Sequence, residues 1–123
     1  MGRLKETFLD RAESFADRVL DVVDAIEGKS RSKRIVDQMS GSGTAVGANT
    51  FEADEALSRP DFCKCLGIAL KELNETRFWL RLVARRQWLP ESRLSALQKE
   101  ALELRHVLGS MVARTRRAAQ FKV

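Results

Sequence analysis

Apolar residues recur along most of the chain at alternating steps of three and four, the spacing of helices that each bury one seam. The pattern divides into four segments, and it predicts helices over about 3–27, 32–57, 59–87 and 91–118. The third seam is the clearest, and it reads Phe62, Leu66, Ala69, Leu73, Thr76, Leu80 and Val83 without a change of phase. Because the connections are short, neighbouring helices are expected to be antiparallel. The sequence therefore predicts an all-α, up-down-up-down four-helix bundle that forms a single domain over residues 1–123.

Capping residues support the same boundaries. Gly28 follows the first segment, as a residue that tolerates the left-handed C-cap. Either Ser30 or Ser32 can cap the second helix. Ser58 to Asp61 has the form of a capping box with proline in the first turn, and Pro90 stands near the start of the fourth helix.

The second helix is the least regular of the four, because Gly41, Gly43 and Gly47 interrupt it. Each glycine costs about 1 kcal/mol relative to alanine in a helix interior. We expect one continuous helix nevertheless, since the phase holds and a row of small residues lets a neighbouring helix approach closely. Asn49 falls on the seam that is expected to be buried. A buried Asn selects the alignment in which it finds a partner, so Asn49 is predicted to be a specificity residue.

Polar side chains pair up on the second and third helices. Asn49 and Glu52 lie one turn apart, as do Glu72 and Glu75. We expect these four residues to form a polar network between the two helices or between subunits. A two-metal site in such a bundle requires Glu-x-x-His on two helices, but His106 is the only histidine. No metal and no other cofactor is therefore predicted.

The sequence offers no convincing catalytic group. The serines beside Gly41 and Gly43 have no nearby histidine, and Cys63 or Cys65 would need His106 from another helix. The glycine-rich stretch also lacks the Gly-Lys-Ser/Thr ending and the preceding strand of a phosphate loop. We predict that the protein is not an enzyme.

Three large apolar residues of the third helix, Ile68, Phe78 and Trp79, lie off its seam. Extended apolar patches are rare on the surfaces of monomers. These residues are accordingly predicted to form the contact surface of a homo-oligomer.

The net charge of +5 is unevenly distributed, because the segment through Glu27 carries seven acids against four bases. Basic residues gather on the third helix and near the end of the fourth. On a monomer such a ridge is ordinarily a solvated face, but a ring would add the fields of several copies and attract a polyanion. We expect RNA or DNA to bind without sequence preference. The candidate residues are Arg77, Arg81, Arg85, Arg86, Arg114, Arg116 and Arg117.

No apolar run approaches the roughly 20 residues of a membrane span, and the N-terminus has no signal-peptide core. A cytoplasmic protein with no membrane partner is expected.

The stretch from Ser40 to Ala53, followed by Ala56, Ser58, Asp61-Phe62, Ile68-Ala69, Lys71-Glu72, Glu75-Thr76 and Trp79-Leu80, resembles a known family. It is that of the bacterial four-helix-bundle proteins encoded in intervening sequences of 23S ribosomal RNA genes. The resemblance implies a left-handed bundle, a homopentameric ring and no catalytic activity. The arginine usual in that family is absent from the stretch that Ser40 and Gly41 occupy here.

Phe78 to Arg81, Leu108 to Met111 and the basic end are similar to a related branch, the accessory protein of diversity-generating retroelements. That resemblance implies a protein that works with a reverse transcriptase and holds nucleic acid. Two functions follow as hypotheses. The first is an oligomeric scaffold that binds RNA or DNA, and the alternative is an adaptor that grips a partner enzyme without binding nucleic acid itself.

Overall fold

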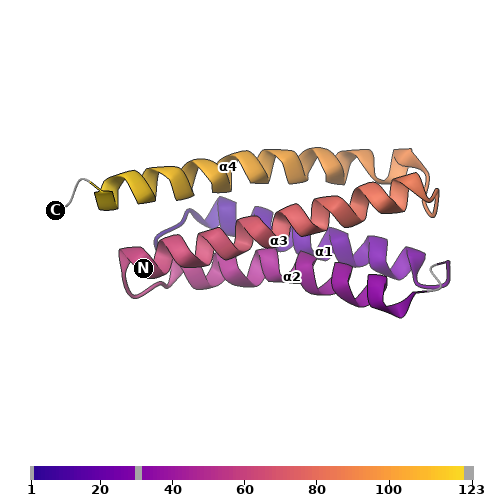
Figure 1. Cartoon of the computed structure of the whole chain (residues 1–123), viewed down its shortest axis with the longest axis horizontal. Coiled ribbons are helices and arrows are strands. Elements are labelled where there is room, and N and C mark those ends of the chain that lie inside the picture. The colour runs from indigo at the N-terminus through magenta and orange to yellow at the C-terminus, as the bar shows by residue number, and fades with distance from the viewer. Residues whose placement is uncertain (1, 30–31, 121–123) are drawn as a thin grey trace.

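The computed structural model describes residues 2–29 and 32–120. It contains four α-helices and one short 3₁₀ helix: α1 (Glu6–Ile26), α2 (Lys33–Asp54), α3 (Arg59–Arg85), η1 (Glu91–Arg93) and α4 (Ser95–Gln120). The described ranges contain no strand. Figure 1 shows the chain reversing direction at each connection, so that consecutive helices run antiparallel. The all-α four-helix fold predicted from the sequence is confirmed, whereas the left-handed twist stays a prediction.

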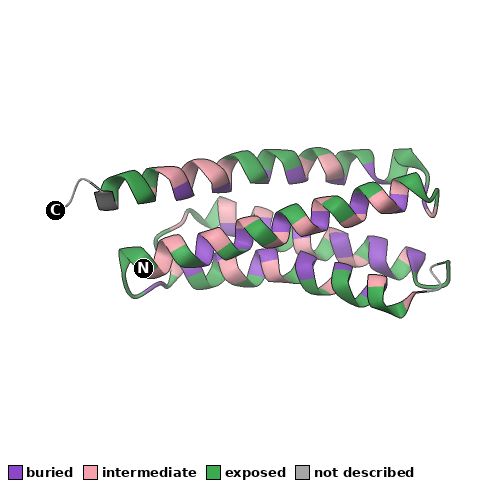
Figure 2. Cartoon of the chain, viewed as in Figure 1, coloured by how far each residue is buried: buried purple, intermediate pink, exposed green. Residues whose placement is uncertain are grey.

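The core follows the seams that the periodicity predicts. On α3 the seam residues from Leu66 to Val83 are buried, and only Phe62 at its start is half-buried. Figure 2 shows the buried positions facing the interior along each helix. Phe15 of α1, Met39 of α2 and Leu104 of α4 complete this interior with side chains that are almost fully enclosed.

The α1–α2 contact is close because α2 carries glycine where α1 crosses it. A Cβ atom added at Gly43 would lie 2.5 Å from Cγ1 of Val19, and one at Gly47 would lie 3.5 Å from the carbonyl oxygen of Ala12. A Cβ at Gly41 would meet nothing within 4 Å. The expectation of one continuous second helix is confirmed, and Gly43 is the position that the close approach requires.

Asn49 is not the buried polar residue that the sequence predicts. It is only half-buried, and its Nδ2 donates to the carbonyl oxygen of Ala45 in its own helix at 2.9 Å. The buried polar contact between α2 and α3 is instead formed by Thr76, whose hydroxyl donates to Oγ of Ser42 at 2.9 Å. A straight helix drifts about 20° per heptad from a 3.5-residue repeat, so the buried line passes from Asn49 to its neighbour Thr50.

The first helix begins at Glu6 rather than at residue 3, because the preceding backbone bonds to the end of α2. The amide of Arg3 donates to the carbonyl oxygen of Asp54 at 2.9 Å, and the amide of Leu4 donates to Oδ1 of Asp54 at 2.7 Å. The second helix correspondingly ends at Asp54 and begins after its N-cap Ser32. The other candidate cap, Ser30, lies outside the described residues.

The turn after α3 has the hydrogen bonds of a Schellman motif. The amide of Trp88 donates to the carbonyl oxygen of Val83 at 3.2 Å, and that of Gln87 donates to Ala84 at 3.0 Å. Gln87 takes the left-handed position with φ 58°, which usually favours glycine. Pro90 then caps η1, so the α-helical part of the fourth segment starts at Ser95 instead of about residue 91.

The fourth helix packs along α3 but only sparsely on α1. A two-pronged ion pair spans this looser side, since Nη2 and Nε of Arg11 lie 2.7 and 3.0 Å from the two carboxylate oxygens of Glu100. That hydrogen bonding raises the pKa of Arg11 against the opposing effect of burial. No other ion pair is found in residues 2–29 and 32–120.

Candidate nucleic-acid interface

A row of hollows follows the outer seam between α3 and α4. Four of them, taken in order from Arg59 to Glu91, are linked by shared lining residues. Leu70 lines the first and the second, Leu102 lines the second and the third, and Arg81 and Gln98 line the third and the fourth. They form one depression, here named the α3–α4 furrow. It accompanies most of α3, whose 27 residues extend over about 40 Å at 1.5 Å per residue.

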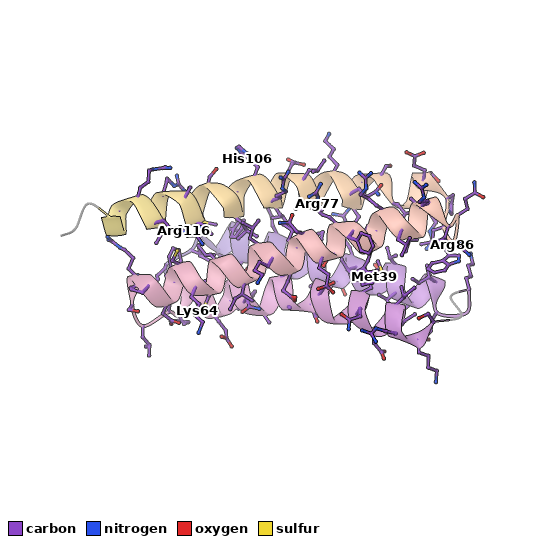
Figure 3. The ribbon with its side chains drawn as sticks, viewed as in Figure 1. Met39, Lys64, Arg77, Arg86, His106 and Arg116 are labelled. Atoms are coloured by element: carbon purple, nitrogen blue, oxygen red, sulfur yellow. The ribbon has the colours of Figure 1, made fainter. Side chains whose placement is uncertain are left out.

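Basic side chains dominate the lining of the furrow. Six come from α3 and two from α4, namely Arg59, Lys64, Lys71, Arg77, Arg81, Arg85, Arg105 and Arg116. Among the described residues that line these hollows, Glu91 is the sole acid. In Figure 3 Arg77 and Arg116 lie between α3 and α4, one near the middle of the furrow and the other toward one end. The charged side chains that line the furrow are therefore almost all positive.

The charge is most crowded at Arg77. Burial lowers the pKa of this guanidinium, and the like charges of Arg105 and Arg81 lower it further. Its Nη1 donates to Oδ1 of Asn74 at 3.2 Å, a neutral partner. No carboxylate within the described ranges forms an ion pair with any of the three arginines. An anion entering the furrow at this point would relieve repulsion instead of displacing an existing partner.

Apolar side chains lie among these charges. Phe78 is 56% exposed and Leu102 49% exposed, although both are large. Phe78 lines the same hollow of about 510 Å³ as Arg81 and Arg85. Ile68, 38% exposed, lies at the opposite end of the furrow beside Lys64. The surface is thus suited to a ligand that is anionic and also has flat or apolar parts.

The sequence identifies part of this lining. Four of the seven predicted arginines line the furrow: Arg77, Arg81, Arg85 and Arg116. The other three are exposed elsewhere: Arg86 follows the end of α3, and Arg114 and Arg117 lie on α4 outside the hollows.

Sequence reasoning missed Arg59, Lys64, Lys71 and Arg105. A signal for two of them was present, because Lys64, Lys71 and Arg85 are separated by multiples of seven and so share one face of α3 with Phe78. For Arg105, which comes from the other helix, the sequence holds no comparable signal.

The predicted polar network is not joined by hydrogen bonds within the described part of one chain. Nε1 of Trp79 donates to Oε2 of Glu75 at 3.0 Å, a bond inside α3. Burial, and then the charge of Glu75, raises the pKa of the Glu72 carboxyl. Glu52 on α2 acts across the helix pair on Cys65, whose thiol pKa is raised by burial first and then by Asp61 and Glu52. A network between subunits stays a prediction.

These acidic side chains do not assemble a metal centre. In residues 2–29 and 32–120 no group of three or more His, Cys, Asp or Glu side chains is placed to hold an ion. None of the helices in the described part of the chain combines the length and apolar character that crossing a bilayer requires.

Comparison with known proteins decides the family. The family model of the 23S rRNA-intervening sequence protein matches residues 5–110. The chain belongs to this family. A crystal structure from Bacteroides thetaiotaomicron, of a protein with unknown function from the S23 ribosomal protein family, has a TM-score of 0.79 and 33% sequence identity. The match covers 85% of this chain and 96% of that chain. A search of curated proteins finds no match.

The part matched by the intervening-sequence family includes all of α3 and the first part of α4. It contains every basic residue of the furrow lining except Arg116, which lies beyond residue 110. The predicted residues Arg114 and Arg117 also lie beyond residue 110. The resemblance stated from the sequence motifs is confirmed for this family.

Proposed function

We propose that this member of the intervening-sequence family binds RNA or DNA through the α3–α4 furrow, without reading base sequence and without catalysing a reaction. The observation that carries the proposal is a row of adjoining hollows whose described lining residues include eight basic side chains and a single acid. Each lysine or arginine side chain that neutralises a phosphate releases condensed counterions, and this release drives most non-specific binding.

The shape of the furrow favours phosphate contacts over base reading. Sequence-specific helical motifs insert one helix into the major groove and present side chains to base edges. Here α3 and α4 lie side by side, so their shared surface offers Arg77, Arg81 and Arg105 to a backbone alongside them. Contacts of this kind position a nucleic acid but carry no sequence information.

Self-association is the second part of the proposal, with a ring as the arrangement that the family resemblance implies. Ile68 is partly exposed and Trp79 half-buried, as residues of a contact surface between copies would be in a separated chain. Phe78 lines the furrow beside Arg81 and Arg85, and Ile68 lines its opposite end, so a contact surface built on Ile68 and Trp79 would border the furrow. A ring would add the fields of several furrows. Sedimentation at micromolar concentration tests this part, and the mass of a single chain would contradict it.

Anisotropy titrations with labelled mixed-sequence oligonucleotides test the binding. We expect affinity to fall steeply between about 50 and 200 mM salt. The triple variant Arg77→Gln, Arg81→Gln, Arg105→Gln should weaken binding at least about tenfold and reduce the slope against log salt by about three.

The matched control removes the same charge outside the furrow with Arg18→Gln, Lys33→Gln and Arg34→Gln on α1 and α2, and it should change affinity less than about twofold by the same electrostatic reasoning. Equal losses in the two triple variants would contradict the furrow as the site. No binding at low salt would overturn the proposal and would favour the adaptor alternative.

A further inference from the structure

We propose that the α3–α4 furrow accepts single-stranded nucleic acid in preference to a duplex, and that Phe78 is the platform on which one of its bases stacks. This inference rests on the proposed function. It adds that the nucleic acid is single-stranded and that one of its bases stacks on Phe78, neither of which follows from the charge of the furrow.

The first argument is the position of Phe78. A phenylalanine with 56% of its side chain exposed lies in one hollow with Arg81 and Arg85, next to Leu82 and Gln98. Sites for single strands combine a basic groove with aromatic rings, because every base has a face that can stack while its phosphate is held by arginine or lysine. The hollow contains both elements.

The second argument is that the ring is held in place. Trp79 packs edge-to-face against Phe78, with ring centroids 4.9 Å apart and an interplanar angle of 63°. Trp79 is itself anchored, since its Nε1 donates to Oε2 of Glu75 at 3.0 Å. A base that stacks on Phe78 therefore meets a ring that is already oriented.

The third argument is the spacing of charge along α3. Lys64, Lys71, Phe78 and Arg85 follow one another at intervals of seven residues, about 10.5 Å each at 1.5 Å per residue. The aromatic ring thus alternates with lysine and arginine side chains along one line of the helix. Arg77 and Arg105 supply the crowded charge in the adjoining middle of the furrow.

The width of the furrow separates a single strand from a duplex. The axes of packed helices lie about 8–10 Å apart, which limits the width of the depression between them. A B-form duplex is wider than this depression, because its major groove alone measures about 12 Å across. A duplex would rest on the rim with its bases stacked inside and out of reach of Phe78. A single strand can lie within the furrow and turn a base toward the ring.

The experiment compares a labelled mixed-sequence single strand of 20 nucleotides with the corresponding duplex, at two salt concentrations. Phe78→Ala should weaken single-strand binding roughly 5- to 100-fold, the range of losses for one stacked base. Duplex binding should change less than about twofold, and the salt slope should stay the same because no charge is removed. Phe78→Trp should retain the single-strand affinity.

Phe51→Ala is the matched control, since Phe51 is a similarly exposed aromatic residue that lies on α2, outside the lining of the furrow. Its single-strand affinity should remain within about twofold of the unmodified protein, because no stacking contact is lost. Circular dichroism and light scattering on each variant measure its fold and its mass.

Four outcomes would overturn the inference. If Phe78→Ala binds the single strand normally while the triple arginine variant does not, stacking is wrong and the proposed function stands. If the unmodified protein binds the duplex as tightly as the single strand, the preference is wrong. If Phe78→Ala changes the mass in solution, Phe78 belongs to a subunit contact instead. If the unmodified protein binds neither oligonucleotide, the proposed function itself fails.

Discussion

The helix pair α1–α2 and the helix pair α3–α4 meet in different ways. In the first pair Gly43 lets the backbones approach until a Cβ atom would collide with Val19, and the seam is closed. In the second pair hollows follow the seam, and a Cβ added at Gly67 or Gly109 would meet nothing within 4 Å. The second pair thus leaves room for a ligand along its seam.

The charges of the two pairs differ as well. A line of exposed acids runs along the outer face of α1 at steps of three and four: Glu6, Asp10, Glu13, Asp17, Asp21 and Asp24. The α3–α4 furrow carries bases from two helices and one acid. These charges would repel a polyanion from the outer face of α1 and attract it to the furrow, as the proposed function requires.

The largest expected effect comes from replacing two positive charges of the furrow with negative ones, like those on the outer face of α1. Arg77→Glu with Arg81→Glu places two carboxylates where the guanidinium groups are most crowded. Oligonucleotide affinity at about 50 mM salt should fall at least about 100-fold in an anisotropy titration, because attraction at the site becomes repulsion.

The matched change on the other pair is Asp10→Asn, Asp17→Asn and Asp24→Asn, which makes the net charge more positive away from the furrow. Its effect should be a gain of less than about threefold, since charges much farther apart than the Debye length, which exceeds about 10 Å at this salt concentration, are largely screened. A gain comparable to the loss in the furrow variant would mean that total charge, not the furrow, governs binding.

The second prediction concerns the closed and open seams. Gly43→Ala should lower the free energy of unfolding by about 1–3 kcal/mol, because the added methyl group overpacks against Cγ1 and Cβ of Val19. Gly109→Ala, in the middle of α4, should raise it by up to about 1 kcal/mol through helix propensity. Urea denaturation measures both. The distinction between the seams would be wrong if the two variants shifted stability in the same direction.

The third prediction lies in the turn that joins the open pair. Gln87 holds a left-handed φ of 58°, which costs a residue with a Cβ roughly 1–2 kcal/mol. Gln87→Gly should therefore stabilise the protein by about 0.5–1 kcal/mol after allowing for the greater freedom of glycine in the unfolded chain. Gln87→Ala keeps the strain and serves as the control in the same denaturation series. A glycine variant no more stable than the alanine variant would rule out this strain.

The same contrast explains how much could be predicted. A pattern within one helix can be read from the sequence, as the buried line from Leu66 to Val83 on α3 and the acidic line on α1 illustrate. Arg105 lies beside Arg77 only because of the register in which α4 packs on α3, and that register is set by tertiary contacts. The sequence therefore identifies four of the eight basic residues that line the furrow, but not the furrow itself.

Errors at single positions have the same origin. Asn49 and Thr50 differ by one residue, and a strict 3.5-residue repeat does not say which of them is buried. The segment before Glu6 has helical composition, yet Arg3 and Leu4 bond to Asp54, which is distant in sequence. Neither outcome is encoded in local periodicity.

The smallest expected effect tests the acids that face away from the furrow. Since burial and Glu75 raise the pKa of Glu72, the folded protein binds a proton there more readily than the unfolded chain does. The favourable contribution is complete below the unfolded pKa and is lost as the pH rises through the folded one.

Glu72→Gln removes this half-buried charge, so it should stabilise the protein at pH 7 by less than about 0.5 kcal/mol, within the usual range of surface substitutions. The difference from the unmodified protein should shrink as the pH falls and disappear near about pH 3, well below the ordinary glutamate pKa of about 4.3, where the carboxyl is protonated in both states. Glu13→Gln on the exposed face of α1 is the control and should change stability little at either pH. A Glu72→Gln variant that is less stable at pH 7 would show instead that the carboxylate has a favourable partner, as a polar network between subunits requires.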